Sequence, residues 1–305
     1  MSEGRSYIVE APAKINLGLE VIRQRDDWYH DINTLFATIN LCDEIELRAR
    51  DDGAITCAVE GNDALRDEPL KRNLCVKAAQ ALREEFMLTS GIDITLHKHI
   101  PTGAGLGGGS SDAAALLRGA VQLWKKSIEE ERLLEIAASL GSDVPFLIRG
   151  GVAHGSSRGE MLERFEVELP WHCLIINPGI HIPTSWAYRQ VKRTMERRAS
   201  DLVALLRQGL RDSLSMRRHF ANDFEPPVFA AYPEIGAIKE KLYHYGALFA
   251  LMSGSGSTVF GLFETRAGAE KAEVAFGDYW RRIVRFRSGL LMSPESPGKI
   301  SSSQN

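Results

Sequence analysis

Residues 101–112 read PTGAGLGGGSSD, and five of the seven residues from 103 to 109 are glycine. Before this stretch, Ile92, Ile94 and Leu96 alternate with polar residues, which predicts a strand. After it, apolar residues recur at helical spacing from Ala113 to Trp124. The order of strand, glycine loop and helix directs backbone N–H groups and a helix N-terminus at one place. Such a place favours phosphate, because glycine lets the backbone approach a ligand closely.

Other kinds of glycine loop fit this stretch less well. No Lys-Ser or Lys-Thr closes the loop, so it is not a Walker A motif. Gly103, Gly105 and Gly108 form G-x-G-x-x-G, but a dinucleotide fold needs a second strand with an acidic residue roughly 20 positions on. Here residues 125–130 read KKSIEE and lead into another helical pattern. A surface turn without a ligand is also disfavoured, because the helix-capping residues Ser-Ser-Asp follow the glycines.

The segment GLGGGSSDAA at 105–114 resembles the second motif of the GHMP small-molecule kinases, which include galactokinase, homoserine kinase and mevalonate kinase. The resemblance implies an α+β fold of two domains, with mixed sheets and helices and the active site in the cleft between the domains. It also implies an ATP-binding loop made of Pro101, Gly103, Ala104, Gly105, Leu106, Gly107, Gly108, Gly109, Ser110 and Ser111. We expect the adenine pocket among residues between Leu47 and Lys98.

The segment APAKINL at 11–17 resembles the first motif of the same family. Residues 15, 17, 19 and 21 are apolar and share one strand face, while Lys14 and Asn16 point to the other face. Without the motif, that polar face would be read as an ordinary solvated strand. The resemblance instead implies that Lys14 is catalytic and that Asn16 contacts the substrate.

The segment GSDVPF at 141–146 resembles the family segment that carries the catalytic aspartate, here Asp143. Gly141 is expected to end the helix that runs to Leu140, and Asp143 alone would be read as a helix cap. The resemblance implies that Asp143 accepts the proton of the substrate hydroxyl. Lys14 would keep Asp143 ionised and offset charge at the reacting oxygen.

A second glycine-serine stretch, MSGSGSTVF at 252–260, resembles the third motif of this family, which packs against the nucleotide loop. The resemblances therefore run in consistent order from about residue 11 to residue 263. Several motifs in sequence are far more specific than any one of them.

Aromatic residues mark the expected substrate side. In the branch of the family that acts on a cytidyl alcohol, a Tyr-His pair holds the cytosine, and Tyr29-His30 matches it. The segment NPGIHIPT at 177–184 resembles the same branch and implies that Thr184 and Tyr188 complete the pocket, with Trp186 as an alternative to Tyr188. Asp143 would also contact the substrate.

Trp28 is a departure from that pattern, since the branch has Asp-Gly-Tyr-His where this chain has Asp27-Trp28-Tyr29-His30. Tryptophan tolerates positive φ poorly. Either the turn is remodelled or Trp28 adds a stacking surface.

The resemblance implies a specific reaction. ATP, with Mg²⁺, phosphorylates the 2-hydroxyl of 4-diphosphocytidyl-2-C-methyl-D-erythritol and gives the 2-phosphate and ADP. This step belongs to the methylerythritol phosphate route of isoprenoid and terpenoid biosynthesis. Two alternatives stay open: another GHMP kinase of homoserine or mevalonate type, and a non-catalytic ligand sensor with the same fold.

Composition sets the remaining expectations. The chain has 305 residues, 44% of them hydrophobic, and a net charge of −3, which gives no electrostatic case for nucleic-acid or membrane binding. Cys42, Cys57, Cys75 and Cys173 show no metal spacing and are typical of a reduced, cytoplasmic protein. Only ten residues precede Ala11, which leaves no room for a signal peptide. We expect a monomer or homodimer acting on a small molecule.

The domain organisation follows from changes in pattern along the chain. We expect an N-terminal ATP-binding and catalytic domain over 1–155, a C-terminal domain over 156–290 and a disordered tail over 291–305. Strands are predicted at Val167–Leu169 and Cys173–Ile176, and an alternating, half-exposed strand at Trp280–Arg287.

Overall fold

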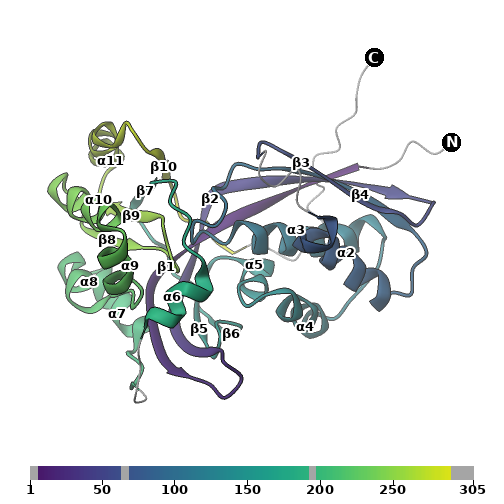
Figure 1. Cartoon of the computed structure of the whole chain (residues 1–305), viewed down its shortest axis with the longest axis horizontal. Helices are drawn as coiled ribbons and strands as arrows, with labels where there is room; N and C mark the ends of the chain where they lie inside the picture. Colours follow the sequence, from purple (N-terminus) through teal and green to yellow (C-terminus); the bar gives the residue numbers. More distant parts are fainter. Residues whose placement is uncertain (1–5, 63–68, 192–196, 290–305) are drawn as a thin grey trace.

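The computed structural model describes residues 6–62, 69–191 and 197–289. They form two lobes, each built on one β-sheet with helices packed against it (Figure 1). This confirms the predicted α+β class. The predicted tail at 291–305 lies outside the described residues.

The first lobe contains a six-stranded sheet with the order β3-β4-β2-β5-β6, and β1 pairs with β2. Its strands are β1 (Ser6–Gln24), β2 (His30–Arg50), β3 (Ile55–Glu60), β4 (Gly91–His97), β5 (Val152–Ser156) and β6 (Met161–Arg164). All pairs are antiparallel except β3 with β4. β2 pairs along its length with β1 and, at successive stretches, with β5 and β4.

Among the described residues, four helices cover this sheet, namely α2 (Leu74–Glu85), α3 (Gly108–Leu123), α4 (Glu130–Leu140) and α5 (Val144–Arg149), with a short η1 (Leu70–Arg72) before them (Figure 1). Asn73 caps α2, because its side chain accepts a hydrogen bond from the Cys75 N–H at 2.8 Å. The alanine-rich face of α3 packs into the core beside Phe36, Ile45 and Leu47. Small side chains let α3 lie close to the sheet, which fixes the position of the loop before it.

The second lobe has a four-stranded antiparallel sheet with the order β10-β7-β9-β8. Its strands are β7 (His172–Asn177), β8 (Phe249–Met252), β9 (Val259–Phe263) and β10 (Trp280–Val284). Its helices are α6 (Thr184–Gln190), α7 (Leu202–Gly209), α8 (Ser213–His219), α9 (Glu225–Ala231), α10 (Pro233–His244) and α11 (Arg266–Glu273), with η2 (Val274–Phe276) after α11. The predicted strands around Cys173–Ile176 and near Trp280 are confirmed.

Two local predictions are wrong. Residues 165–171 form no strand, so the alternation at Val167 and Leu169 reflects an extended segment packed on the core without a partner strand. The helix after the glycine loop begins at Gly108 and has Gly107 at its N-cap, so Ser110 and Ser111 lie in the first turn and do not cap it.

A border between the lobes slightly later than the expected residue 155 keeps the first sheet whole. Position 155 lies inside β5, and β6 pairs with β5 in the first sheet. A cut there would separate two paired strands, so we propose that the first domain extends through Arg164. Near the end of the described chain, Phe286 bridges back to Ile39 of β2.

Candidate active site

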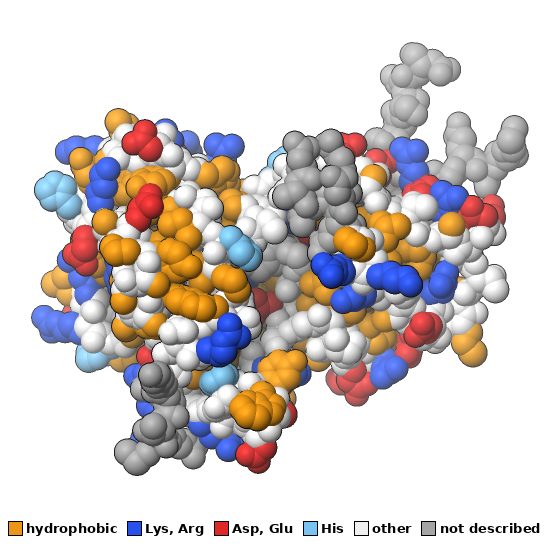
Figure 2. Space-filling model, viewed as in Figure 1, with side chains coloured by type: hydrophobic (Ala, Val, Ile, Leu, Met, Phe, Trp, Pro, Cys, Tyr) orange, Lys and Arg blue, Asp and Glu red, His pale blue; other side chains and the backbone are white. Residues whose placement is uncertain are grey.

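The two lobes enclose a cavity of about 1380 Å³. The space-filling view shows the surface hollowed between them (Figure 2). The first lobe contributes Lys14, the glycine loop and Asp143, and the second contributes residues 181–185, Tyr188 and Phe224. Residues far apart in the sequence therefore face one space, as the resemblance implied.

Backbone geometry shapes the glycine loop. Gly103, Gly105 and Gly107 have φ of 64°, 77° and 70°, a region that side chains rarely adopt. A Cβ on Gly105 would lie 2.0 Å from the Ser253 carbonyl oxygen, so no side chain fits there. Gly107 in this conformation turns the chain into α3, whose N-terminal N–H groups face the cavity end of the loop.

The glycine-serine loop at 253–258 packs against the first loop. The Ser253 hydroxyl donates to the Gly105 carbonyl at 2.9 Å and accepts from the Asn16 N–H at 3.2 Å. The Thr258 N–H donates to the Ala104 carbonyl at 3.2 Å. Three motifs that are distant in sequence are thus tied together by hydrogen bonds to backbone atoms.

Most of the expected ATP-binding residues line the cavity, but two do not. Those that line it are Pro101, Gly103, Ala104, Gly105, Gly107, Gly108, Gly109 and Ser110. Leu106 is buried, and its carbonyl accepts from the Lys14 N–H at 2.9 Å. Ser111 is also buried, and its hydroxyl donates to the Pro12 carbonyl at 2.7 Å. The side chains of these two residues position the loop, and their expected part in ATP binding stays a prediction for their backbone atoms.

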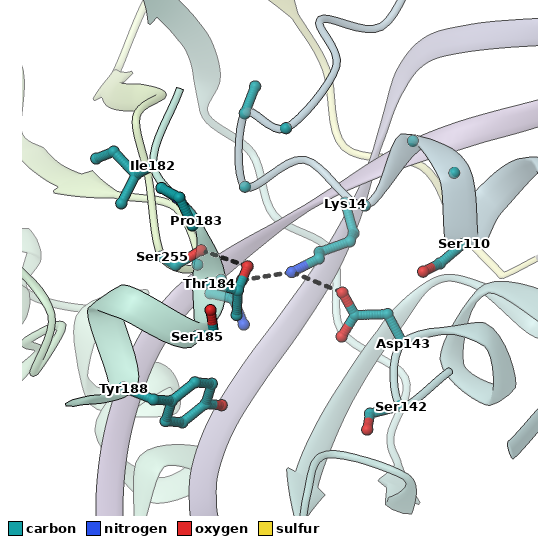
Figure 3. A pocket seen from close by; sticks show the side chains of 18 of the residues that line it. Lys14, Ser110, Ser142, Asp143, Ile182, Pro183, Thr184, Ser185, Tyr188 and Ser255 are labelled. Atoms are coloured by element: carbon teal, nitrogen blue, oxygen red, sulfur yellow. Dashed lines mark hydrogen bonds and ion pairs between the residues drawn. The ribbon is translucent and has the colours of Figure 1, made fainter. Parts of the chain in front are cut away.

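Lys14 and Asp143 form an ion pair inside the cavity (Figure 3), with 3.2 Å between Lys14 Nζ and Asp143 Oδ2. Lys14 is almost fully buried, whereas the Asp143 side chain is 30% exposed. Asp143 is at the N-cap of α5 and makes no capping hydrogen bond, which leaves its carboxylate free to face Lys14. A buried ammonium beside an accessible carboxylate can orient that carboxylate and stabilise negative charge near it.

The Asn16 side chain holds the Lys14 ammonium in place. Lys14 Nζ donates to Asn16 Oδ1 at 2.8 Å, and Asn16 Nδ2 donates to Thr34 Oγ1 at 2.8 Å. These bonds fix the amide with its oxygen toward the lysine. Asn16 therefore positions Lys14 in addition to lining the cavity, a role that the sequence pattern did not indicate. The solvated-face interpretation of this strand is wrong, because both residues are buried.

An aromatic wall forms the other end of the cavity. The rings of His30 and Tyr188 are stacked with centroids 4.8 Å apart, and Phe224 meets Tyr188 edge-on at 4.8 Å. Burial lowers the pKa of His30 and raises the pKa of Tyr188. The negative charge of Asp143 raises the pKa of Tyr188 further. Both side chains are therefore uncharged at neutral pH and suit a neutral base.

Tyr188, not Trp186, is the aromatic residue of α6 that lines this cavity. Trp186 instead packs edge-on against Tyr232 at 5.8 Å. Thr184 also lines the cavity, and its hydroxyl lies 3.1 Å from that of Ser255 (Figure 3). Tyr29 is 54% exposed and has the Arg158 guanidinium over its ring at 4.8 Å.

Sequence reasoning missed two parts of the cavity. Beyond the glycine loop the wall is formed by Arg72, Asn73, Leu74, Leu96 and Lys98, which come from two segments within the range expected for the adenine pocket. An asparagine before a helical pattern is typical of a helix cap and does not by itself indicate a ligand. Arg158 was missed because an isolated arginine in a turn carries no sequence signal.

A buried charge cluster lies behind the loop. Lys98 Nζ donates to Asp112 Oδ2 at 2.7 Å and also binds Asp43, whose other oxygen accepts the N–H groups of His99 and Ile100. Asp112 Oδ1 is buried and has no hydrogen-bond partner in the described parts of the chain. Burial, with Asp43 adding to it, raises the pKa of Asp112 to about 7. Two carboxyl groups thus share one ammonium directly under the glycines.

Comparisons with known proteins agree with this site. Residues 73–151 match the GHMP kinases N terminal domain, and residues 201–282 match the GHMP kinases C terminal domain. A 4-diphosphocytidyl-2-C-methyl-D-erythritol kinase from Chlorobium phaeobacteroides is 44% identical over 274 residues, which are 89% of this chain and 94% of that relative.

Solved structures of GHMP kinases are also similar to this chain. A crystal structure of 4-(cytidine 5'-diphospho)-2C-methyl-D-erythritol kinase is 33% identical, with a TM-score of 0.74, and the match covers 91% of this chain and 99% of that one. A homoserine kinase from Cytophaga hutchinsonii has a TM-score of 0.74 at 22% identity, covering 94% and 97% of the two chains, which shows a shared fold.

The chain belongs to the GHMP kinase family. It is an ATP-dependent kinase of a small molecule, which confirms the class of enzyme that the motifs implied. Within the described ranges, no helix combines the length and the apolar character that crossing a bilayer requires.

Proposed function

We propose that this protein transfers the γ-phosphoryl group of ATP to the 2-hydroxyl of 4-diphosphocytidyl-2-C-methyl-D-erythritol, in the methylerythritol phosphate route of isoprenoid biosynthesis. Two relatives named 4-diphosphocytidyl-2-C-methyl-D-erythritol kinase are 44% and 45% identical over 89% and 88% of this chain. The structural observation that carries the proposal is the Lys14–Asp143 pair, which lies in one cavity with both the glycine loop and the aromatic wall.

Asp143 is the proposed general base. It takes the proton from the substrate hydroxyl while the oxygen attacks the γ-phosphorus, and the bond from that phosphorus to the β–γ bridging oxygen breaks, releasing ADP. An aspartate suffices for this role because a loose transition state lets the proton leave late. Lys14, held by Asn16, orients the base and stabilises charge on the reacting oxygens.

The nucleotide occupies the end of the cavity at the glycine loop. Its phosphates lie against the loop from Gly103 to Gly109 and the first turn of α3, where backbone N–H groups and the helix dipole favour anions. The adenine lies beyond them against Asn73, Leu74 and Leu96, which line the same cavity. Leu74 and Leu96 supply an apolar surface for a flat base.

A magnesium ion fits this site if it enters bound to the phosphates of ATP. In the described part of the chain, no group of three His, Cys, Asp or Glu side chains could hold a metal ion. Phosphate oxygens and water would therefore fill most of its coordination positions. Asp143, whose side chain is 30% exposed in the cavity, can hold water of the ion's shell. When bound, the ion neutralises phosphate charge.

The cytidyl group occupies the aromatic end. The uncharged ring of His30 can exchange hydrogen bonds with the amine and ring nitrogen of cytosine, and aromatic faces nearby can stack on it. The closed stack of His30 on Tyr188 leaves no room for a base between these two rings. The base must therefore stack on an outer face or separate the pair.

A coupled ADP-release assay with Mg²⁺ and ATP tests this proposal. It compares 4-diphosphocytidyl-2-C-methyl-D-erythritol, homoserine and mevalonate in parallel. Turnover of the cytidyl compound alone is expected. Turnover of homoserine or mevalonate instead would keep the fold and the Lys14–Asp143 chemistry but discard the cytosine pocket. ATP binding without turnover of any alcohol would favour a ligand sensor.

Cytoplasmic location and a monomeric or homodimeric state are part of the same proposal. All four cysteines carry free thiols, which suits a reducing compartment. One chain supplies residues to both ends of the cavity. Light scattering of the purified protein measures its mass and tests the oligomeric state directly.

A further inference from the structure

Trp28 is placed where a tryptophan is costly in two ways. Its side chain is 81% exposed, although an indole is largely apolar. Its φ is 66°, in the left-handed region that disfavours bulky side chains. Both costs fall on one residue, and backbone strain of this kind concentrates where ligands bind.

The geometry of the turn explains the positive φ of residue 28 but does not explain why this residue is a tryptophan. The Trp28 N–H donates to the Arg25 carbonyl at 3.2 Å, and the Arg25 N–H donates to the Tyr29 carbonyl at 2.8 Å, which closes the loop between β1 and β2. A loop of this length needs one residue with positive φ before the second strand, and glycine suits it best. Something other than the turn must therefore favour tryptophan here.

The hairpin tip is firmly held. The Arg25 guanidinium binds Asp27 at 3.2 Å, Asp31 at 3.3 Å and the Ser157 hydroxyl at 3.0 Å. Arg158 covers the ring of Tyr29 from the neighbouring turn. Trp28 is thus presented on an anchored loop, so little conformational freedom is lost if its indole contacts a ligand.

Trp28 also lines the cavity, next to Tyr29 and His30. From these observations we propose that Trp28 is a substrate-binding residue, whose indole covers the pyrimidine nucleotide of the acceptor at the mouth of the aromatic end. The inference rests on the proposed function, because it needs a cytidyl substrate in that end. An indole face offers any base a large stacking surface.

The structure supplies a matched control. Met87 is also large, apolar and exposed, and its φ is 51°, but it lies after α2 and does not line the cavity. Replacing either residue with glycine relieves the same kind of backbone strain. Replacement of Trp28 alone removes a surface from the cavity.

The experiment compares wild type with Trp28→Gly, Trp28→Phe and Met87→Gly in steady-state kinetics and thermal unfolding. Both glycine variants are expected to unfold at a higher temperature, by about 1–3 °C. Only Trp28→Gly is expected to raise KM for the cytidyl substrate, by about tenfold, with KM for ATP unchanged. Trp28→Phe is expected to recover most of that loss, because it keeps an aromatic face.

A residue with a merely structural role would not combine greater stability with weaker substrate binding. If wild type turns over the cytidyl substrate and Trp28→Gly has the same KM, the inference is wrong while the proposed function stands. If Met87→Gly raises KM equally, the effect is not local to the cavity and the inference is also wrong. If wild type does not turn over this substrate, the proposed function fails and the inference fails with it.

Discussion

The two ends of the cavity are built in different ways. At the nucleotide end the wall proposed to hold the phosphates is mostly backbone, fixed by glycines with positive φ and by hydrogen bonds between loops distant in sequence. At the aromatic end the wall is made of side chains on a hairpin tip and on α6. A backbone wall can serve any nucleoside triphosphate, whereas a side-chain wall can change with the acceptor. Specificity for the alcohol therefore lies at the aromatic end.

The largest effect is expected at the junction between the two ends. Asp143→Asn keeps the shape of the side chain but removes the base, so turnover should fall by about 10²–10⁴-fold. The variant should still bind ATP, because the loop does not contact this side chain through any hydrogen bond or ion pair among the described residues. Steady-state kinetics and calorimetric binding of an ATP analogue measure the two effects separately.

The control for Asp143→Asn is Asp212→Asn, which changes a helix cap outside the cavity. It should lower stability slightly and leave turnover intact. Turnover of Asp143→Asn within a few-fold of wild type would remove Asp143 from the mechanism.

Gly105→Ala should damage the nucleotide end. The new Cβ would meet the Ser253 oxygen at 2.0 Å, so the two loops must separate. We expect KM for ATP to rise at least about tenfold and stability to fall by about 2–4 kcal/mol, as for other strained or overpacked sites. Urea unfolding and ATP titration measure these changes.

Gly179→Ala is the matched control for this loop. Its φ of 75° is almost the same as that of Gly105, but a Cβ there meets nothing within 4 Å. It should cost about 1 kcal/mol from backbone conformation alone and leave KM for ATP unchanged. Equal effects of the two variants would show that contact between the loops does not shape the nucleotide end.

Tyr188→Ala tests the aromatic end. It removes the ring that stacks on His30, so KM for the cytidyl substrate should rise about tenfold while KM for ATP stays constant. Tyr188→Phe keeps the ring and should stay within about threefold of wild type. Trp186→Phe changes a residue outside the cavity and should leave both constants unchanged. A larger effect from Trp186→Phe than from Tyr188→Ala would reverse the choice between these aromatics.

The sequence predicted the features that continuous motifs carry and missed those that only packing brings together. The glycine loop, Lys14 and Asp143 were identifiable because their motifs are short and continuous along the chain. The burial of the Leu106 and Ser111 side chains was not predictable, because a motif does not say which side chains of a loop turn inward. The cluster of Asp43, Lys98 and Asp112 was missed, because it joins three separate elements and only packing brings them together.

The last expected effect is on the pH dependence of stability and concerns that cluster behind the nucleotide end. The pKa of Asp112 is raised on folding from 3.8 to about 7, so between these values the folded chain holds a proton that the unfolded chain has lost. The contribution of Asp112 to stability therefore falls as pH rises through this window and stays unfavourable above pH 7. Asp112→Asn leaves Lys98 paired with Asp43 alone and removes this dependence.

Urea unfolding of wild type and Asp112→Asn at several values from pH 5.5 to 8 measures the difference. The variant should gain on wild type by up to about 1.4 kcal/mol per pH unit below pH 7, and the gain should level off above it. Asp201→Asn, at an exposed helix cap, should follow the wild-type slope. Parallel curves for wild type and Asp112→Asn would mean that Asp112 is ionised throughout, with Lys98 outweighing burial. The nucleotide end would then carry a fixed negative charge behind its glycines, and only the α3 N-terminus and the loop N–H groups would attract phosphate there.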